Sequence, residues 1–170
     1  MIRAKDPSVL FLAETLGDEA RLDIVQRSIN YEHKWIVPKE GHGGGLVPFW
    51  KSTVNLEVID SSQYYIDTWI DRGSEHEWRF TSFYGEPDTS KRTEAWDNLR
   101  ALNHHPQTPW LCAGDFNELT RQEEKLGEAI RQDRQMQLFR DVIDECGFLD
   151  LGFMGNRFTC SKHFEDGHSI

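Results

Sequence analysis

Apolar residues along this chain follow two periods, and blocks of the two kinds alternate. A two-residue or continuous apolar pattern predicts strands at 8–13, 46–50, 54–60, 63–70, 77–84 and from residue 110. Apolar residues three and four apart predict helices at 18–30, from Asp88 or Ser90 to about residue 104, and at 133–146 before Gly147. Residues 148–153 and 157–160 complete the predicted core segments, and the last ten residues are expected to fray.

The first predicted strand ends in a carboxylate. Its continuous apolar run over residues 8–13 indicates a strand buried on both faces, and Glu14 follows at its end. Further along, the glycine-rich stretch 41–45 predicts a turn. Pro48 indicates that the strand after this turn is an edge strand, a bulged strand or a short one, because proline cannot donate to a sheet ladder.

The stretch from Trp110 to Glu118 carries the most candidate chemistry. A short apolar run ends at Gly114, which predicts a buried strand that stops abruptly. Asp115 and Asn117 lie two residues apart, so an extended backbone would project both side chains to the same side. A carboxylate that activates water beside an amide that holds a phosphoryl oxygen suits phosphate-ester chemistry. The alternative is an ordinary Asx-type turn.

Tyr84 ends another predicted strand, just before Gly85. Because Pro87 follows two residues later, the strand cannot continue far, and we expect the phenol at the mouth of the sheet rather than in its middle. The alternative is a half-buried aromatic ring whose hydroxyl reaches water.

Length and composition favour one domain. The chain has 170 residues, of which 38% are hydrophobic, and this suffices for a single core over residues 1–170. No stretch approaches the roughly 20 continuous apolar residues of a membrane-spanning helix, and the first residues lack the apolar run of a signal peptide. We therefore expect an intracellular protein without a membrane partner. Three widely spaced cysteines, Cys112, Cys146 and Cys160, predict reduced thiols rather than a disulfide framework.

The net charge of −10 bears on any nucleic-acid substrate. Asp and Glu outnumber Lys and Arg by 29 to 19, whereas a protein that neutralises many phosphates usually presents a basic face. Carboxylates are nevertheless required where a divalent cation is bound, and a basic groove can lie on an acidic molecule. Charge therefore disfavours a nuclease without excluding one.

Together, these segments resemble the endonuclease/exonuclease/phosphatase (DNase I-like) superfamily, in particular the endonuclease domain of plant non-LTR (LINE-type) retrotransposons. The matching segments cover nearly the whole chain in the family's order, and the Gly-Asp-Phe-Asn block after a strand-terminal Glu is the most specific of them. They are residues 9–15, 44–50, 78–85, 109–118, 139–141 and 149–159.

The resemblance implies a four-layer α/β (α+β) sandwich with two mostly antiparallel sheets flanked by helices. It implies that Glu14 binds the metal, Tyr84 contacts the scissile phosphate, Asp115 activates the water nucleophile and Asn117 orients the phosphate. The implied cofactor is Mg²⁺, with Mn²⁺ as an alternative, and the implied reaction is in-line phosphodiester hydrolysis. DNA is the implied substrate, which suggests action in the nucleus, and a reverse transcriptase region would accompany the domain in its parent element.

The sequence departs from the family pattern at both ends. The family's first strand, with a metal-adjacent asparagine, and its C-terminal Ser-Asp-His segment have no counterpart here, so we expect an incomplete, truncated domain. Three functions follow from the resemblance: a DNA endonuclease, a phosphatase or phosphodiesterase of the same fold acting on a soluble or lipid phosphate, or a non-catalytic remnant. The sequence makes no prediction of the oligomeric state.

Overall fold

A computed structural model describes residues 5–15, 17–40, 43–105, 107–126, 130–155 and 158. Contacts within the chain group it into two compact units. The first unit comprises Met1–Glu86 with His105–Phe116, and the second unit comprises Pro87–His104 with Asn117–Ile170. The prediction of a single domain over residues 1–170 stays a prediction. Among the described residues, none of the helices is both long enough and apolar enough to cross a membrane.

Strand β4 (Gly43–Trp50) is the centre of the first sheet. It pairs antiparallel with β1 (Val9–Leu12) on one side and with β2 (His33–Lys34) and β3 (Val37–Glu40) on the other. The prediction that Pro48 makes this strand an edge, a bulged or a short strand is wrong, because β4 is central and pairs without a register shift over eight residues. The Pro48 carbonyl accepts the Trp35 N–H at 3.2 Å, between the ladders of β2 and β3. In an antiparallel strand, the N–H and C=O of one residue face the same neighbouring strand. At Pro48 both face the gap between β2 and β3, so the N–H that proline lacks falls where neither ladder needs a donor.

Two other predictions for this sheet need correction. Gly43 and Gly44 pair with Glu40 and Lys39, so β4 begins inside the stretch predicted as a turn. Every residue of β1 is half-buried rather than buried on both faces, because β1 pairs only with β4 among the described strands and lies at the margin of the sheet.

Helix α2 (Glu19–Ile29) forms where the sequence predicts it. The Asp18 carboxylate accepts the Arg21 N–H at 2.9 Å as the N-cap, and Asn30 ends the helix in a left-handed conformation with φ 59°. The apolar stripe of α2 packs on one face of the first sheet. The buried residues of this core are Leu22, Tyr31, Val47 and Phe49, and the half-buried residues packed against them are Leu10, Leu12, Val25, Ile29 and Ile36.

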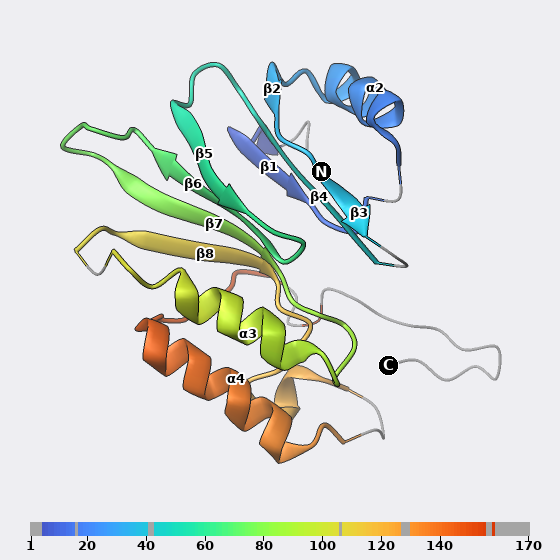
Figure 1. Ribbon diagram of the computed structural model, residues 1–170, viewed down its shortest axis with the longest axis vertical. Coiled ribbons are helices and arrows are strands. Elements are labelled where there is room, and N and C mark those ends of the chain that lie inside the picture. The colour runs from blue at the N-terminus through green and yellow to red at the C-terminus, as the bar shows by residue number, and fades with distance from the viewer. Residues whose placement is uncertain are drawn as a thin grey trace. The chain divides into compact units, whose positions relative to one another are not determined.

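The second sheet has the order β5 (Leu56–Ser61), β6 (Tyr65–Ile70), β7 (Trp78–Tyr84), β8 (Trp110–Asp115), as Figure 1 shows. The first three strands are antiparallel, whereas β7 and β8 run parallel. β6 is buried along its whole length. β8 was predicted as a buried strand but is half-buried at its start and exposed at its end, because β7 is its only partner among the described strands.

The two sheets pack face to face inside the first unit. Leu46 of β4 contacts Ile66 of β6 and Tyr84 of β7 in one buried cluster, with half-buried Phe11 and Val58 at its edge. Because successive strand residues alternate between faces, Leu46 meets the second sheet while its neighbour Val47 meets α2. The first unit therefore stacks helix, sheet and sheet, and the predicted pair of mostly antiparallel sheets is confirmed.

The second unit contains helices α3 (Arg92–Ala101) and α4 (Asp133–Cys146) and the 3₁₀ turn η1 (Gln122–Glu124). The helices pack through Trp96 and Phe139, whose rings stack with centroids 4.8 Å apart. The predicted α4 is confirmed, with Gly147 as its left-handed C-cap. The predicted cap of α3 is wrong, because the Asp88 carboxylate accepts the Ser90 N–H and hydroxyl in a turn that precedes the helix.

Residues 148–153 do not form the predicted core segment in the described chain. Leu149, Leu151 and Phe153 are 86%, 82% and 68% exposed. These residues belong to no helix or strand, so no regular apolar face forms for them to pack. Arg157, Thr159 and Cys160 lie outside the described residues, as do the last ten. Among the described residues, Cys112 and Cys146 are not joined by a disulfide.

Candidate functional site

Glu14 and Tyr84 meet although 70 residues separate them in the sequence. Glu14 follows β1 in a left-handed conformation with φ 55°, and its side chain is exposed. Tyr84 is the last residue of β7 and is 4% exposed. Its phenol donates a hydrogen bond to Oε1 of Glu14. The phenol therefore has a protein partner, contrary to the alternative in which it only reaches water.

Asp115 lies beside Tyr84 at the end of the second sheet. The two residues are direct partners in the parallel pairing of β7 and β8, and each is the last residue of its strand. The Gly85 N–H donates to the Asp115 carbonyl at 2.7 Å, which extends the pairing by one residue. The structure thus brings Glu14, Tyr84 and Asp115 to one end of the two packed sheets.

Glycine permits this close approach of the strand ends. A Cβ at Gly114, where φ is 152°, would lie 1.8 Å from the Phe83 carbonyl oxygen. A Cβ at Gly85 would lie 1.9 Å from the Phe116 carbonyl oxygen. Real Cβ atoms do not approach backbone oxygens so closely, so both positions require glycine. The rings of Phe83 and Phe116 also stack, with centroids 5.3 Å apart, and add an apolar contact between the same two segments.

Asn117 belongs to the second unit and is half-buried. The predicted convergence of the Asn117 and Asp115 side chains requires an extended backbone through both residues. Strand β8 instead ends at Asp115, and Asn117 is left-handed with φ 53°. Its predicted role stays a prediction.

Glu118, which follows Asn117 and for which the sequence predicts no role, is held by ion pairs. Its side chain is 1% exposed and forms ion pairs with Arg92 and, at 2.9 Å, with Nε of Arg131. It also accepts the Leu119 N–H at 3.0 Å. A buried carboxylate between two guanidiniums fixes the chain that follows Asn117.

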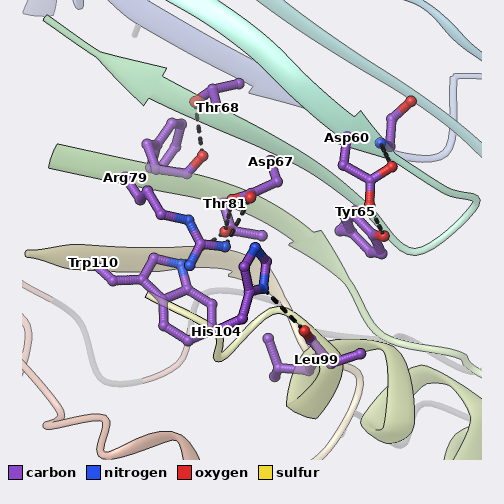
Figure 2. Close-up of polar contacts among 12 residues, drawn as sticks. Asp60, Tyr65, Asp67, Thr68, Arg79, Thr81, Leu99, His104 and Trp110 are labelled. Atoms are coloured by element: carbon purple, nitrogen blue, oxygen red, sulfur yellow. Dashed lines mark hydrogen bonds and ion pairs between the residues drawn. The ribbon is translucent and has the colours of Figure 1, made fainter. Parts of the chain in front are cut away.

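A second group that sequence reasoning missed lies inside the first unit, between strands β6, β7 and β8 (Figure 2). Asp67 and Arg79 form an ion pair at 2.7 Å, and neither side chain has exposed surface. Thr81 donates to the other oxygen of Asp67 at 2.6 Å and accepts the Trp110 indole N–H at 2.8 Å. The signal in the sequence is a lone carboxylate within the apolar run 64–70.

Tyr65 is a neighbouring titratable group on β6. Its hydroxyl donates to Asp60 at 2.6 Å, and the residue is 7% exposed (Figure 2). Burial, followed by the hydrogen bond to Asp60, raises the pKa of Tyr65 far above its ordinary range. The phenol therefore stays neutral at physiological pH and acts as a structural donor.

The chemistry of the donor set fits Mg²⁺ or Mn²⁺ held by a single protein carboxylate. Among the described residues, no group of three or more His, Cys, Asp or Glu side chains is placed to hold a metal ion. Glu14 supplies one exposed carboxylate whose orientation Tyr84 fixes. Mg²⁺ commonly takes one or two carboxylates and completes its shell with water and substrate phosphate oxygens. Glu14 is thus a suitable single protein ligand.

Solved structures share this fold. An endonuclease domain of TRAS1, a telomere-specific non-LTR retrotransposon, matches with a TM-score of 0.55 at 13% identity over 86% of this chain and 61% of that one. A 3′ phosphatase, NExo from Neisseria, solved with a product DNA hairpin, matches with a TM-score of 0.59 at 14% identity over 85% and 63%. A humanised D. rerio TDP2 gives 0.50 at 15% identity over 69% and 52%. The chain spans less than two thirds of the length of these structures.

These likenesses confirm the predicted DNase I-like fold. A search of curated proteins finds no matching sequence. The sequence profile described as the Endonuclease/Exonuclease/phosphatase family matches residues 1–165, which is almost the entire chain. This match agrees with the two packed sheets and the carboxylates at the strand ends, and we conclude that this chain belongs to the Endonuclease/Exonuclease/phosphatase family.

Proposed function

We propose that this chain hydrolyses phosphodiesters in a reaction that depends on a divalent metal, and that DNA is its substrate. The observation that carries the proposal is the meeting of Glu14, Tyr84 and Asp115 at neighbouring strand ends. Two structures of the same fold support the choice of DNA, since one is an endonuclease domain and another was solved with a product DNA hairpin.

The residues divide the chemistry among them. Glu14 would hold Mg²⁺, which when bound offsets charge on the phosphoryl oxygens. The phenol of Tyr84 donates its single O–H to the Glu14 carboxylate in this structure. It would contact the scissile phosphate by turning that O–H toward a phosphoryl oxygen once Glu14 holds the metal. The Asp115 carboxylate accepts a proton from the attacking water, and the Asn117 amide donates to a phosphoryl oxygen.

A retrotransposon origin is the finer part of the proposal. It is supported by the ordered motif segments of the sequence and by the fold shared with a non-LTR retrotransposon endonuclease domain. The domain would then act on nuclear DNA beside a reverse transcriptase region of its parent element.

Nicking of supercoiled plasmid tests the proposal. The purified 170-residue protein is incubated with plasmid and Mg²⁺, with Mn²⁺, or with EDTA. We expect nicking with either metal, none with EDTA, and none from Glu14→Ala. Glu75→Ala is the matched control, because Glu75 is an exposed loop carboxylate that the site does not use. Metal-dependent nicking by Glu14→Ala at the parent rate would contradict the assignment of Glu14.

Asp115→Ala tests the proposed base. We expect loss of cleavage by a factor of at least about 10². Because Asp115 is exposed at a strand end, the free energy of unfolding should change by less than about 1 kcal/mol. Plasmid nicking and urea unfolding of the same preparation measure the two effects. Retained cleavage would refute the role, and a large loss of stability would make the residue structural.

A phosphatase or phosphodiesterase acting on a soluble or lipid phosphate is the second candidate. The net charge of −10 favours it, because a small phosphate needs no extended basic face. The shared fold of a 3′ phosphatase also supports it. Release of inorganic phosphate from a 3′-phosphorylated oligonucleotide and from an inositol phosphate, without plasmid nicking, would favour this candidate. No turnover of any of these substrates by the folded protein would favour the non-catalytic remnant.

A further inference from the structure

We propose that Asp67, Arg79, Thr81 and Trp110 are positioning residues whose buried network fixes the register of β8 on β7 and so places Asp115 beside Tyr84. That this placement matters for catalysis rests on the proposed function. That the network fixes the register does not. We refer to these four residues as the register network.

The register network joins three strands by side chains alone (Figure 2). Asp67 comes from β6, Arg79 and Thr81 come from β7, and Trp110 is the first residue of β8. Both oxygens of Asp67 are engaged, one by Arg79 and one by Thr81. Trp110 is bound twice, through its indole N–H to Thr81 and by the Arg79 guanidinium 4.7 Å from its ring centroid. The network therefore recognises one particular residue of β8.

Such recognition adds to the close approach of Gly114 to Phe83, because main-chain hydrogen bonds by themselves do not define this register. β8 lies at the margin of the described sheet and is parallel to β7, so sliding it by two residues restores an equivalent ladder and keeps the same side chains on each face. After such a slip Tyr84 would lie opposite Ala113 or Asn117 instead of Asp115. Cys112, the next β8 residue on the Trp110 face, could not replace the indole as donor and ring.

Stability alone does not account for a buried ion pair. Burying two charges costs about as much as their attraction returns, and apolar residues of similar volume are often as stable. Buried polar groups are best attested as devices that select one register, since only one alignment satisfies every donor and acceptor. Asp67 and Arg79 have no exposed side-chain surface. A register that moved Trp110 away would therefore leave this charged pair without its contact to the indole.

A disulfide between β7 and β8 reports the register without any activity assay. Ser82 and Ala113 are register partners, so cysteines there would lie about 4.8 Å apart between Cα atoms, within disulfide range. A two-residue slip would separate them by about 8 Å, beyond that range. The Ser82 hydroxyl has no hydrogen-bond partner in the described structure, so replacing it removes none. The native Cys112, Cys146 and Cys160 are changed to alanine in every protein tested.

Two variants remove the network in different ways. Thr81→Val with Trp110→Phe deletes the hydroxyl and indole links, and Asp67→Leu with Arg79→Met replaces the ion pair by apolar volume. We expect both to unfold cooperatively, and the yield of the Ser82→Cys/Ala113→Cys disulfide to fall roughly fivefold or more. Thr68→Val is the matched control, because buried Thr68 donates to the Phe80 carbonyl at 2.7 Å and lies on β6, which pairs with β5 and β7 rather than with β8 (Figure 2). Its disulfide yield should equal that of the parent.

Two outcomes overturn the proposal. An unchanged disulfide yield in the folded variants would show that the register does not need the network. Unfolding of the Asp67→Leu/Arg79→Met protein would show that the ion pair supplies stability instead. Plasmid nicking is measured in parallel on the parent with reduced cysteines. A native register without any phosphate-ester cleavage would contradict the proposed function alone.

Discussion

At the scale of single residues, unusual backbone conformations occur at several of the candidate residues. Glu14 and Asn117 are left-handed although neither is glycine, with φ of 55° and 53°. Such conformations cost of order 1 kcal/mol each and persist where the surrounding structure enforces them. Gly114, at φ 152°, brings β8 against β7 immediately before Asp115.

Gly114→Ala should destabilise the protein by at least about 3 kcal/mol, because a Cβ would collide with the Phe83 carbonyl oxygen. Gly73→Ala is the control, since Gly73 also has positive φ but no atom lies within 4 Å of its Cβ position. It should cost only about 1 kcal/mol. Urea unfolding of both proteins provides the comparison, and equal losses would show that backbone strain rather than close packing matters at residue 114.

Tyr65 should make stability fall at alkaline pH. Burial and the hydrogen bond to Asp60 raise the pKa of the folded phenol, whereas in the unfolded chain it ionises near its ordinary value of about 10. The stabilisation is therefore complete below about pH 10 and is lost as pH rises toward the folded pKa. The free energy of unfolding should fall less steeply between pH 9 and 11 for Tyr65→Phe than for the parent. Parallel slopes would contradict the raised pKa.

At the scale of elements, local signals begin and end the helices whereas partners decide the strands. α2 lies between the caps Asp18 and Asn30, both visible in the sequence. α3 instead begins after Lys91, which provides no side-chain cap, so its packing against α4 through Trp96 and Phe139 takes the place of a cap.

Asp18→Ala should destabilise the first unit by about 1 kcal/mol, because the Arg21 N–H loses its acceptor. Lys91→Ala occupies the equivalent N-cap position of α3 and should change stability by less than about 0.5 kcal/mol. Thermal unfolding followed by circular dichroism measures both. A loss for Lys91→Ala as large as that for Asp18→Ala would show that capping is not the cause.

At the scale of the whole molecule, the two units are interleaved along the chain. The first unit requires residues 105–116 for its last strand, but residues 87–104, which include α3, belong to the second unit. Completion of the second sheet therefore depends on contacts distant in sequence, such as the Trp110–Thr81 hydrogen bond.

A fragment of residues 1–104 should therefore fail to unfold cooperatively. Without β8 the edge of β7 is unpaired and the Asp67–Arg79 pair loses Trp110, and without α4 the stacked partner of Trp96 is missing. We expect ANS binding and a broad thermal transition for the fragment, compared with a sharp one for the full chain. A transition as sharp as that of the full chain would contradict this dependence.

The sequence by itself determined the elements and the residues at their ends. Periodicity found α2, α4 and the strands around Tyr84 and Asp115, because burial of one face imposes a period on each element. The positions of Glu14, Tyr84, Asp115 and Asn117 at strand ends, together with the family resemblance, singled these residues out as candidates, and their catalytic roles stay predictions.

The tertiary structure alone decided how those elements meet. That Pro48 lies in a central strand depends on the gap between β2 and β3, and that residues 148–153 are exposed depends on whether a partner face exists. The Glu14–Tyr84 hydrogen bond and the register network join residues far apart in the chain. Local periodicity reports which face of an element is apolar, but it contains no information on which element covers that face, and the candidate site is built from those long-range pairings.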